Sequence, residues 1–328
     1  LEPHLLGPGC FRGTCMISIG GENLIDLVSG DSDANGLPRY VANPGGSPFN
    51  VAIATGRQGQ QVAYLTPVSE DALGALLAER LLKSNVVLVA PRVPHPTSLA
   101  VVSVADGIPS YAFHRNATAE RQVSLAALER NMPADTRLMH VGSLSLIDGD
   151  DADAWETFFA RCQDRGIMTA LDPNVRPGLI TDREDYVARI RRMMRHADIF
   201  KLSDEDLRWL YPDITSEAAL AACRADCDAV LFILTMGDDG SRLFLGDLDL
   251  RAAAPSIKNL ADTVGAGDTY MASILCWVLE NGLTSRTALA SIDDAALANA
   301  ATRAGEAAAI NCQRSGCNPP WREELVNI

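Results

Sequence analysis

The chain has 328 residues, 47% of them apolar, which is enough for one large domain or about two average ones. Its 42 acidic and 28 basic residues give a formal net charge of −14, which argues against nucleic acid or an anionic membrane as a partner. No apolar run approaches the ~18 residues of a membrane span.

The N-terminal part of the chain predicts an extension, a strand and a helix. Residues 1–15 lack the basic start and apolar core of a signal peptide, so we expect a flexible extension before Met16. Residues 16–21 predict a short buried strand that residues 22–27 continue, and residues 29–36 predict a polar turn. A buried helix follows Gly45-Gly46, with Ser47 as its expected cap and Pro48 at its first position.

Two β-rich hairpins interrupt an alternation of strands and helices along the rest of the chain. Residues 97–105 and 108–114 are joined by Asp106-Gly107, a strong hairpin signal, and we expect them in a separate small sheet. A second hairpin is expected over residues 241–253. The other expected strands are 62–65, 86–90, 138–141, 167–171, 198–202 and 229–235, and the expected helices are 69–81, 124–131, 151–165, 184–196, 204–210, 216–225, 268–280 and 293–312.

Apolar strands that alternate with helices predict a doubly wound α/β fold, in which a mostly parallel sheet is covered by helices on both faces. Ligands bind such sheets beyond the carboxyl ends of the strands. Polar or glycine residues follow several expected strands, namely Asp26, Asp172, Ser203 and Gly237. The coincidence favours one composite site.

Residues 262–268 (DTVGAGD) precede an apolar helix and predict an anion site. Gly265 and Gly267 have no Cβ to block a ligand, and the first amides of a helix are free donors with a partial positive charge. Asp268 would place a carboxylate beside that site, which is electrostatically unfavourable and therefore indicates chemistry. The alternative is an ordinary helix start at which Asp268 interacts with the helix dipole.

Several familiar signatures are missing from the sequence. It contains no GxxxxGK[ST] loop, no GxGxxG fingerprint, no GxSxG elbow and no protein-kinase motif set. The eight cysteines include no CxxC pair, and we interpret them as reduced thiols of a cytoplasmic protein rather than as a zinc site.

Residues 45–52 (GGSPFNVA), with Gly59 beyond, form a second glycine-rich motif besides residues 262–268. In this order, the two motifs resemble the first and second signatures of the ribokinase-like (pfkB-type) carbohydrate kinases. The resemblance extends over most of residues 16–320. Residues 21–26, 113–115 and 172–178 are most similar to the fructokinase branch.

This resemblance implies a ribokinase-like fold with a small β-sheet lid. The large catalytic domain would comprise residues 16–22, 46–93 and 122–328, and the lid residues 23–45 and 94–121. The implied reaction is phosphoryl transfer from ATP, with Mg2+, to a primary hydroxyl of a small sugar, with fructose as the favoured acceptor. Relatives often dimerise through lids, so a homodimer is expected.

The resemblance also implies roles for individual residues. Asp268 would be the general base, and Gly265, Ala266 and Gly267 the anion hole. The substrate would contact Asp26, Gly46, Asn50, Arg115, Asp172 and Arg176, with Asn174 beside them, and the nucleotide would contact Lys201, Ser203, Thr235, Gly237 and Gly240. Asp206 would act near Mg2+ through water, and Asp262 and Thr263 would lie near a monovalent cation such as K+.

Some of these positions have simpler interpretations. Ser203 with Asp206 replaces the family's Asn-x-x-Glu and also matches an imperfect capping box. Arg115 could be a surface arginine and Asp26 a solvated strand end. The alternative functions are a 2-keto-3-deoxygluconate or nucleoside kinase of the same fold, a catalytically silent sugar-binding or regulatory protein, and, more remotely, a nicotinamide-dependent oxidoreductase.

Overall fold

The computed structural model describes residues 16–105 and 108–325. The expected N-terminal extension and the Asp106-Gly107 turn lie outside the described residues. Within them, no helix is long and apolar enough to cross a membrane.

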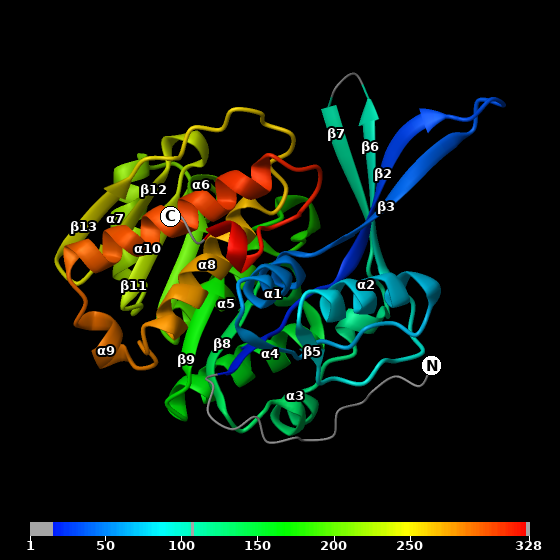
Figure 1. Cartoon of the computed structure of the whole chain (residues 1–328). Helices are drawn as coiled ribbons and strands as arrows, with labels where there is room; N and C mark the ends of the chain where they lie inside the picture. Colours follow the sequence, from blue (N-terminus) through cyan, green and yellow to red (C-terminus); the bar gives the residue numbers. More distant parts are fainter. Residues whose placement is uncertain (1–15, 106–107, 326–328) are drawn as a thin grey trace.

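A nine-stranded sheet forms the body of the molecule, in the order β13-β12-β11-β10-β9-β8-β1-β4-β5 (Figure 1). All neighbours run parallel except β11/β12 and β12/β13. The chain winds outward in both directions from β1, so the predicted doubly wound sheet is confirmed. The strands are β1 (Met16–Ile19), β4 (Gln61–Tyr64), β5 (Val86–Leu88), β8 (Thr136–Gly142), β9 (Met168–Asp172), β10 (Ile199–Ser203), β11 (Leu231–Thr235), β12 (Ser241–Leu245) and β13 (Leu248–Ala252).

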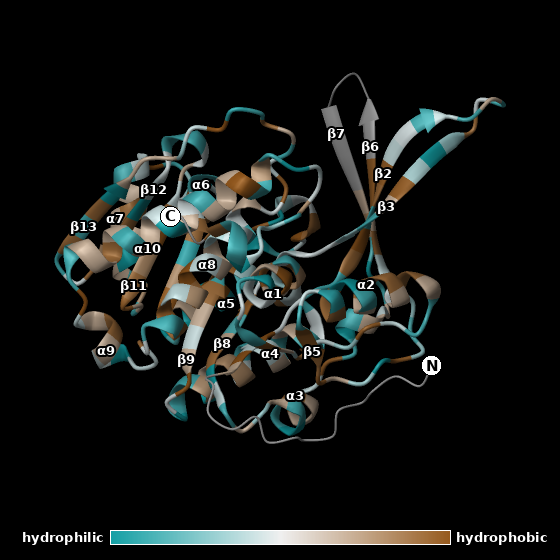
Figure 2. Cartoon of the chain, viewed as in Figure 1, coloured by the Kyte–Doolittle hydropathy of each residue, from teal (hydrophilic) through white to brown (hydrophobic). Residues whose placement is uncertain are grey.

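Helices cover both faces of this sheet, because its strands have apolar side chains on both sides. One apolar cluster packs α1, α2, α8, α9 and α10 against one face, and a second packs α3 to α7 against the other. Figure 2 shows that hydrophobic residues recur along these strands. The helices are α1 (Ser47–Arg57), α2 (Ala72–Lys83), α3 (Leu125–Asn131), α4 (Gly149–Asp164), α5 (Arg183–Met194), α6 (Asp204–Leu210), α7 (Ser216–Ala225), α8 (Ala266–Glu280), α9 (Arg286–Ala290) and α10 (Asp294–Cys312).

A second sheet of four strands projects from one side of the body (Figure 1). Its order is β3-β2-β6-β7, from β2 (Leu24–Ser32), β3 (Pro38–Gly45), β6 (Ser98–Ala105) and β7 (Ile108–His114). β2 and β6 run parallel, whereas β2/β3 and β6/β7 are antiparallel. The expectation that the first hairpin belongs to a separate small sheet is therefore confirmed.

The expected single strand over residues 16–27 is wrong. β1 ends at Ile19, and β2 begins at Leu24 in the other sheet. The chain changes direction at Gly21, whose φ of 130° suits glycine, and the Tyr64 hydroxyl donates to the carbonyl oxygens of Gly21 and Glu22. A hydrophobic pattern predicts extended chain here, but not that it leaves one sheet for another.

The polar turn expected over residues 29–36 is also partly wrong, because β2 continues to Ser32. In addition, the strand β3 was not expected. The outer part of β2 carries polar residues (Figure 2). No buried face imposes an alternating pattern there, so the sequence lacks the usual strand signal. The short helix α9 was not expected either.

Candidate active site

Asp268 lies at the third position of α8, and its side chain is buried, with 6% of its surface exposed. Both carboxylate oxygens accept hydrogen bonds from the first turn of α1. The Ser47 hydroxyl donates to Oδ1 at 2.7 Å, and the Asn50 amide donates to Oδ2 at 2.8 Å. The Asn174 amide is a longer donor to Oδ1, at 3.4 Å. The two glycine-rich motifs, more than 200 residues apart, therefore meet at one carboxylate.

Ser47 does not cap α1, contrary to the sequence-based expectation. The N-cap is Gly46, whose φ is 110° and which makes no side-chain cap. A Cβ at position 46 would lie 2.6 Å from the carbonyl oxygen of Glu22, so only glycine fits. The Ser47 N–H donates to Glu22 Oε1 at 2.8 Å. Sequence reasoning missed Ser47 and Glu22 as site residues.

A buried ion pair lies beside Asp268, between the last residue of β9 and the middle of β10. Lys201 Nζ is 2.7 Å from Asp172 Oδ2, and both side chains are almost fully buried. A Cβ at Gly267 would be 3.2 Å from Lys201 Nζ, so the ammonium group lies directly against the start of α8. The structure thus brings together three predicted site residues, Asp172, Lys201 and Asp268.

The surroundings of this cluster perturb its protonation. Burial raises the pKa of Asp268 above its ordinary value, and Asp172 raises it further, whereas the bonds from Ser47 and Asn50 and the charge of Lys201 oppose the rise. Burial alone would lower the pKa of Lys201, but Asp172 holds it above its ordinary value. An ammonium group thus remains charged beside the carboxylates.

The start of α8 also carries backbone N–H groups without a partner in the described structure. Among the residues that the structure describes, the N–H groups of Gly265 and Gly267 have no hydrogen-bond acceptor, whereas the Ala266 N–H donates to the Thr263 carbonyl at 3.2 Å. Gly265 has a φ of 75°, and a Cβ there would be 2.3 Å from Cys317 Sγ, so the C-terminal segment supports the loop. Two free donors at a helix N-terminus can bind an anion.

Asp26 is held on β2 against Gly45, where a Cβ would lie 2.3 Å from Asp26 Oδ2. Burial raises the pKa of Asp26 to about 6, and the charge of Arg176 opposes the rise. Arg176 donates to Asn174 Oδ1 at 2.6 Å. The small sheet therefore extends a partly buried carboxylate towards the loop after β9, so the solvated strand end is not what the structure shows.

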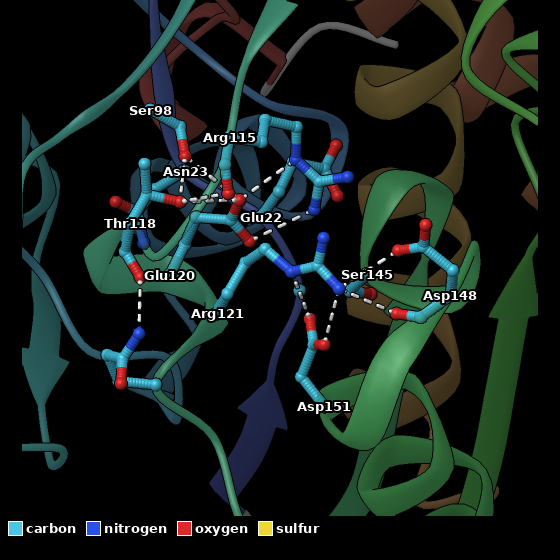
Figure 3. Close-up of polar contacts among 12 residues, drawn as sticks. Glu22, Asn23, Ser98, Arg115, Thr118, Glu120, Arg121, Ser145, Asp148 and Asp151 are labelled. Carbon is cyan, nitrogen blue, oxygen red and sulfur yellow. Dashed lines mark hydrogen bonds and ion pairs between the residues drawn. The ribbon is translucent and has the colours of Figure 1, made fainter.

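Arg115, just after β7, is not a surface arginine. Its guanidinium bonds both oxygens of Glu120, at 2.9 and 3.2 Å, and is 9% exposed. Figure 3 shows this pair beside Glu22, with Ser98 also donating to Glu120. Arg115 lies at the base of the small sheet, and no hydrogen bond joins it to Asp268 in the part of the chain that the structure describes.

The predicted nucleotide residues lie at neighbouring strand ends. Ser203 and Thr235 are register partners at the ends of β10 and β11, and Gly237 and Gly240 form the turn after β11. Ser203 and Asp206 form the capping box of α6.

The predicted metal residues carry oxygen atoms that already accept backbone hydrogen bonds. Asp206 accepts the N–H groups of Ser203 and Val175, and Asp262 accepts those of Val264 and Gly316. Over the described ranges, no group of three or more His, Cys, Asp or Glu side chains is placed to hold a metal ion.

Comparison with known proteins identifies the class of this fold and site. A fructokinase of Rhizobium leguminosarum bv. trifolii is 35% identical over 285 residues, covering 87% of this chain and 86% of that protein. Fructokinase-1 of Oryza sativa subsp. japonica is 30% identical over 320 residues, covering 94% and 95%. Among solved structures, a fructokinase with bound ATP from Xylella fastidiosa superposes with a TM-score of 0.86 at 23% identity, covering 95% and 97%.

These findings define a carbohydrate kinase, an enzyme that transfers a phosphoryl group to an alcohol. Residues 15–324 match the pfkB family carbohydrate kinase, and the chain belongs to that family.

Proposed function

We propose that this carbohydrate kinase transfers the γ-phosphoryl group of ATP to a primary hydroxyl of fructose. The observation that carries the proposal is the buried Asp268 carboxylate beside the free N–H groups of Gly265 and Gly267. The former can take the proton of an attacking hydroxyl, and the latter can stabilise charge on the transferred group. The curated fructokinase relatives support fructose as the acceptor.

On this proposal, the sugar lies between the small sheet, acting as a lid, and the first turn of α1. Asp26, Gly46 and Asn50 would bind its hydroxyls, with Asp172 and Arg176 on the phosphate side. Arg115 would approach the sugar from the base of the lid while Glu120 holds its orientation. Asn50 would then serve both the sugar and Asp268.

The nucleotide would lie over the ends of β10 and β11. Ser203, Thr235, Gly237 and Gly240 are adjacent there, and Lys201 reaches from β10 to the anion loop. A neighbouring ammonium group stabilises phosphate charge, which suits phosphoryl transfer.

Mg2+, when bound, neutralises part of the phosphate charge. The described residues offer single carboxylates rather than a cage, which fits an ion carried by the nucleotide, with Asp206 acting through water. Asp262 and Thr263 would lie near K+, as the family resemblance implies.

Two copies of the chain would associate through their small sheets, again as the resemblance implies.

The test is ADP release with fructose, ribose, 2-keto-3-deoxygluconate and nucleosides as acceptors. We expect fructose to be preferred, and a nucleoside that turned over while fructose stayed inert would refute the choice of sugar. Asp268→Asn should bind ATP and sugar but lose at least ~100-fold in kcat.

Asp151→Asn is the matched control. Asp151 is also at the third position of a helix, α4, and is also 6% exposed, but it pairs with Arg121. We expect this variant to keep near-normal kcat. Near-normal turnover of Asp268→Asn would refute its assignment as the base.

A further inference from the structure

We propose that Ser47 is a positioning residue for Asp268, and that Glu22 fixes Ser47 in place. The inference rests on the proposed function, because it assigns to Asp268 the removal of a proton. It concerns two residues that neither motif reasoning nor the comparisons connect with the base.

A continuous chain of contacts joins Glu22 to Asp268. Glu22 Oε1 accepts the Ser47 N–H at 2.8 Å, and the Ser47 hydroxyl donates to Asp268 Oδ1 at 2.7 Å. All three side chains are at least nine-tenths buried. Water therefore competes little for these bonds, and each link is geometrically restricted.

Among the residues that the structure describes, the Ser47 hydroxyl makes no other hydrogen bond. A serine at a helix start normally caps it, but α1 begins after Gly46 and receives no side-chain cap. Instead the hydroxyl points across to α8. Its bond to Oδ1 is also much shorter than that of Asn174, 2.7 against 3.4 Å, so Ser47 is the principal donor to that oxygen.

A buried base needs such a donor. Burial favours the neutral form of a carboxylic acid, which cannot accept a proton. Hydrogen-bond donors to the carboxylate favour the ionised form and so oppose the effect of burial. The charged and titratable groups facing Asp268 are Asp172 on β9, Lys201 on β10 and the Cys317 thiol from the C-terminal segment, with Asp206 beyond Lys201. From α1 the donors are Ser47 and Asn50. Ser47 thus balances the like charge of Asp172 without carrying a charge of its own.

The test compares Ser47→Ala with Ser273→Ala. Ser273 is also fully buried, on α8, but it bonds Gln58 and the Thr269 carbonyl rather than Asp268. In Ser47→Ala the acid limb of the pH profile of kcat/KM should shift to higher pH by about one unit, because the Asp268 carboxylate loses one hydrogen bond. Activity should recover at higher pH, and the KM for ATP should change less than about twofold. Ser273→Ala should keep the wild-type limb.

A measurement independent of turnover separates this inference from the proposed function. The 13C carboxyl resonance of Asp268, assigned with Asp268→Asn, should titrate about one unit higher in Ser47→Ala than in the wild type. If the wild-type protein phosphorylated no sugar, the proposed function would fail, yet this titration would still decide the role of Ser47. An unshifted titration in Ser47→Ala, or an equal shift in Ser273→Ala, would overturn the inference. Should Ser47→Ala not fold, Ser47→Cys, a weaker donor, supports the same comparison.

Discussion

Lys201→Met should destabilise the protein strongly, because it removes one partner of a buried ion pair. Lys201 and Asp172 are 2.7 Å apart, with side chains only 4% and 1% exposed. Methionine has a similar length but no charge. The Asp172 carboxylate would then be buried near Asp268 without its cation.

The magnitude follows from burial. Removing one partner of a buried pair costs about 3–5 kcal/mol, because the remaining charge is left uncompensated. The same lysine chemistry on the surface is far weaker: Lys83 and Glu79 are 2.6 Å apart, but their side chains are 73% and 57% exposed. Lys83→Met should therefore cost at most about 1 kcal/mol.

Urea unfolding followed by circular dichroism measures both variants. The double variant Lys201→Met with Asp172→Asn should recover much of the lost free energy of unfolding, because neither member of the pair is then left buried as a charge without its partner. If Lys201→Met costs no more free energy of unfolding than Lys83→Met, or if the double variant is no more stable than the single one, the buried pair does not stabilise the protein as expected.

Two further predictions concern the start of α1. Burial raises the pKa of Glu22 from 4.5 to about 7, so stability present at low pH is lost as the pH rises through 7. The glutamine in Glu22→Gln cannot ionise, so the free energy of unfolding of this variant relative to wild type should rise by about 3 kcal/mol between pH 4.5 and 8. If the difference in free energy of unfolding between the two proteins stayed constant over that range, Glu22 would not be a buried ionising group. Gly46→Ala should lower kcat/KM for the sugar at least about tenfold, since a strained backbone displaces Ser47 and Asn50. Gly166 also has a positive φ (75°), but among the described residues no atom outside its chain neighbours lies within 4 Å of a Cβ placed there. Gly166→Ala should therefore lower the free energy of unfolding by only about 1 kcal/mol and leave the kinetics unchanged.

The layered fold could be predicted because its signal is local. Apolar strands separated by amphipathic helices specify a parallel sheet whatever the distant contacts are. The prediction failed where the chain leaves one sheet for the other near Gly21, and at β3, where an exposed pair of strands lacks a buried face. Neither event leaves a periodic pattern.

The site could be predicted only in part, for a related reason. Asp268 and Asn50 lie within motifs of recognisable composition, and the structure joins them at 2.8 Å. The sequence pattern predicts Ser47 as a helix cap, since serine before proline usually serves that purpose. Its actual partner is 221 positions away, a separation at which sequence spacing carries no information. Glu22 was missed because a lone acidic residue after a strand gives no signal of burial.

The hydrogen bonds from α1 to Asp268 also limit how such an enzyme can change the substrate that accepts the phosphoryl group. If Asn50 contacts the sugar as proposed, its amide serves acceptor recognition and proton transfer at once, so exchanging it for another residue alters both. Substitutions that change which sugar is phosphorylated but keep the enzyme active should then accumulate in the small sheet. Asp26 lies there on β2, and in the described structure it makes no hydrogen bond to Asp268. Homologues with different acceptors would accordingly vary most along β2, β3, β6 and β7 while retaining the first turn of α1.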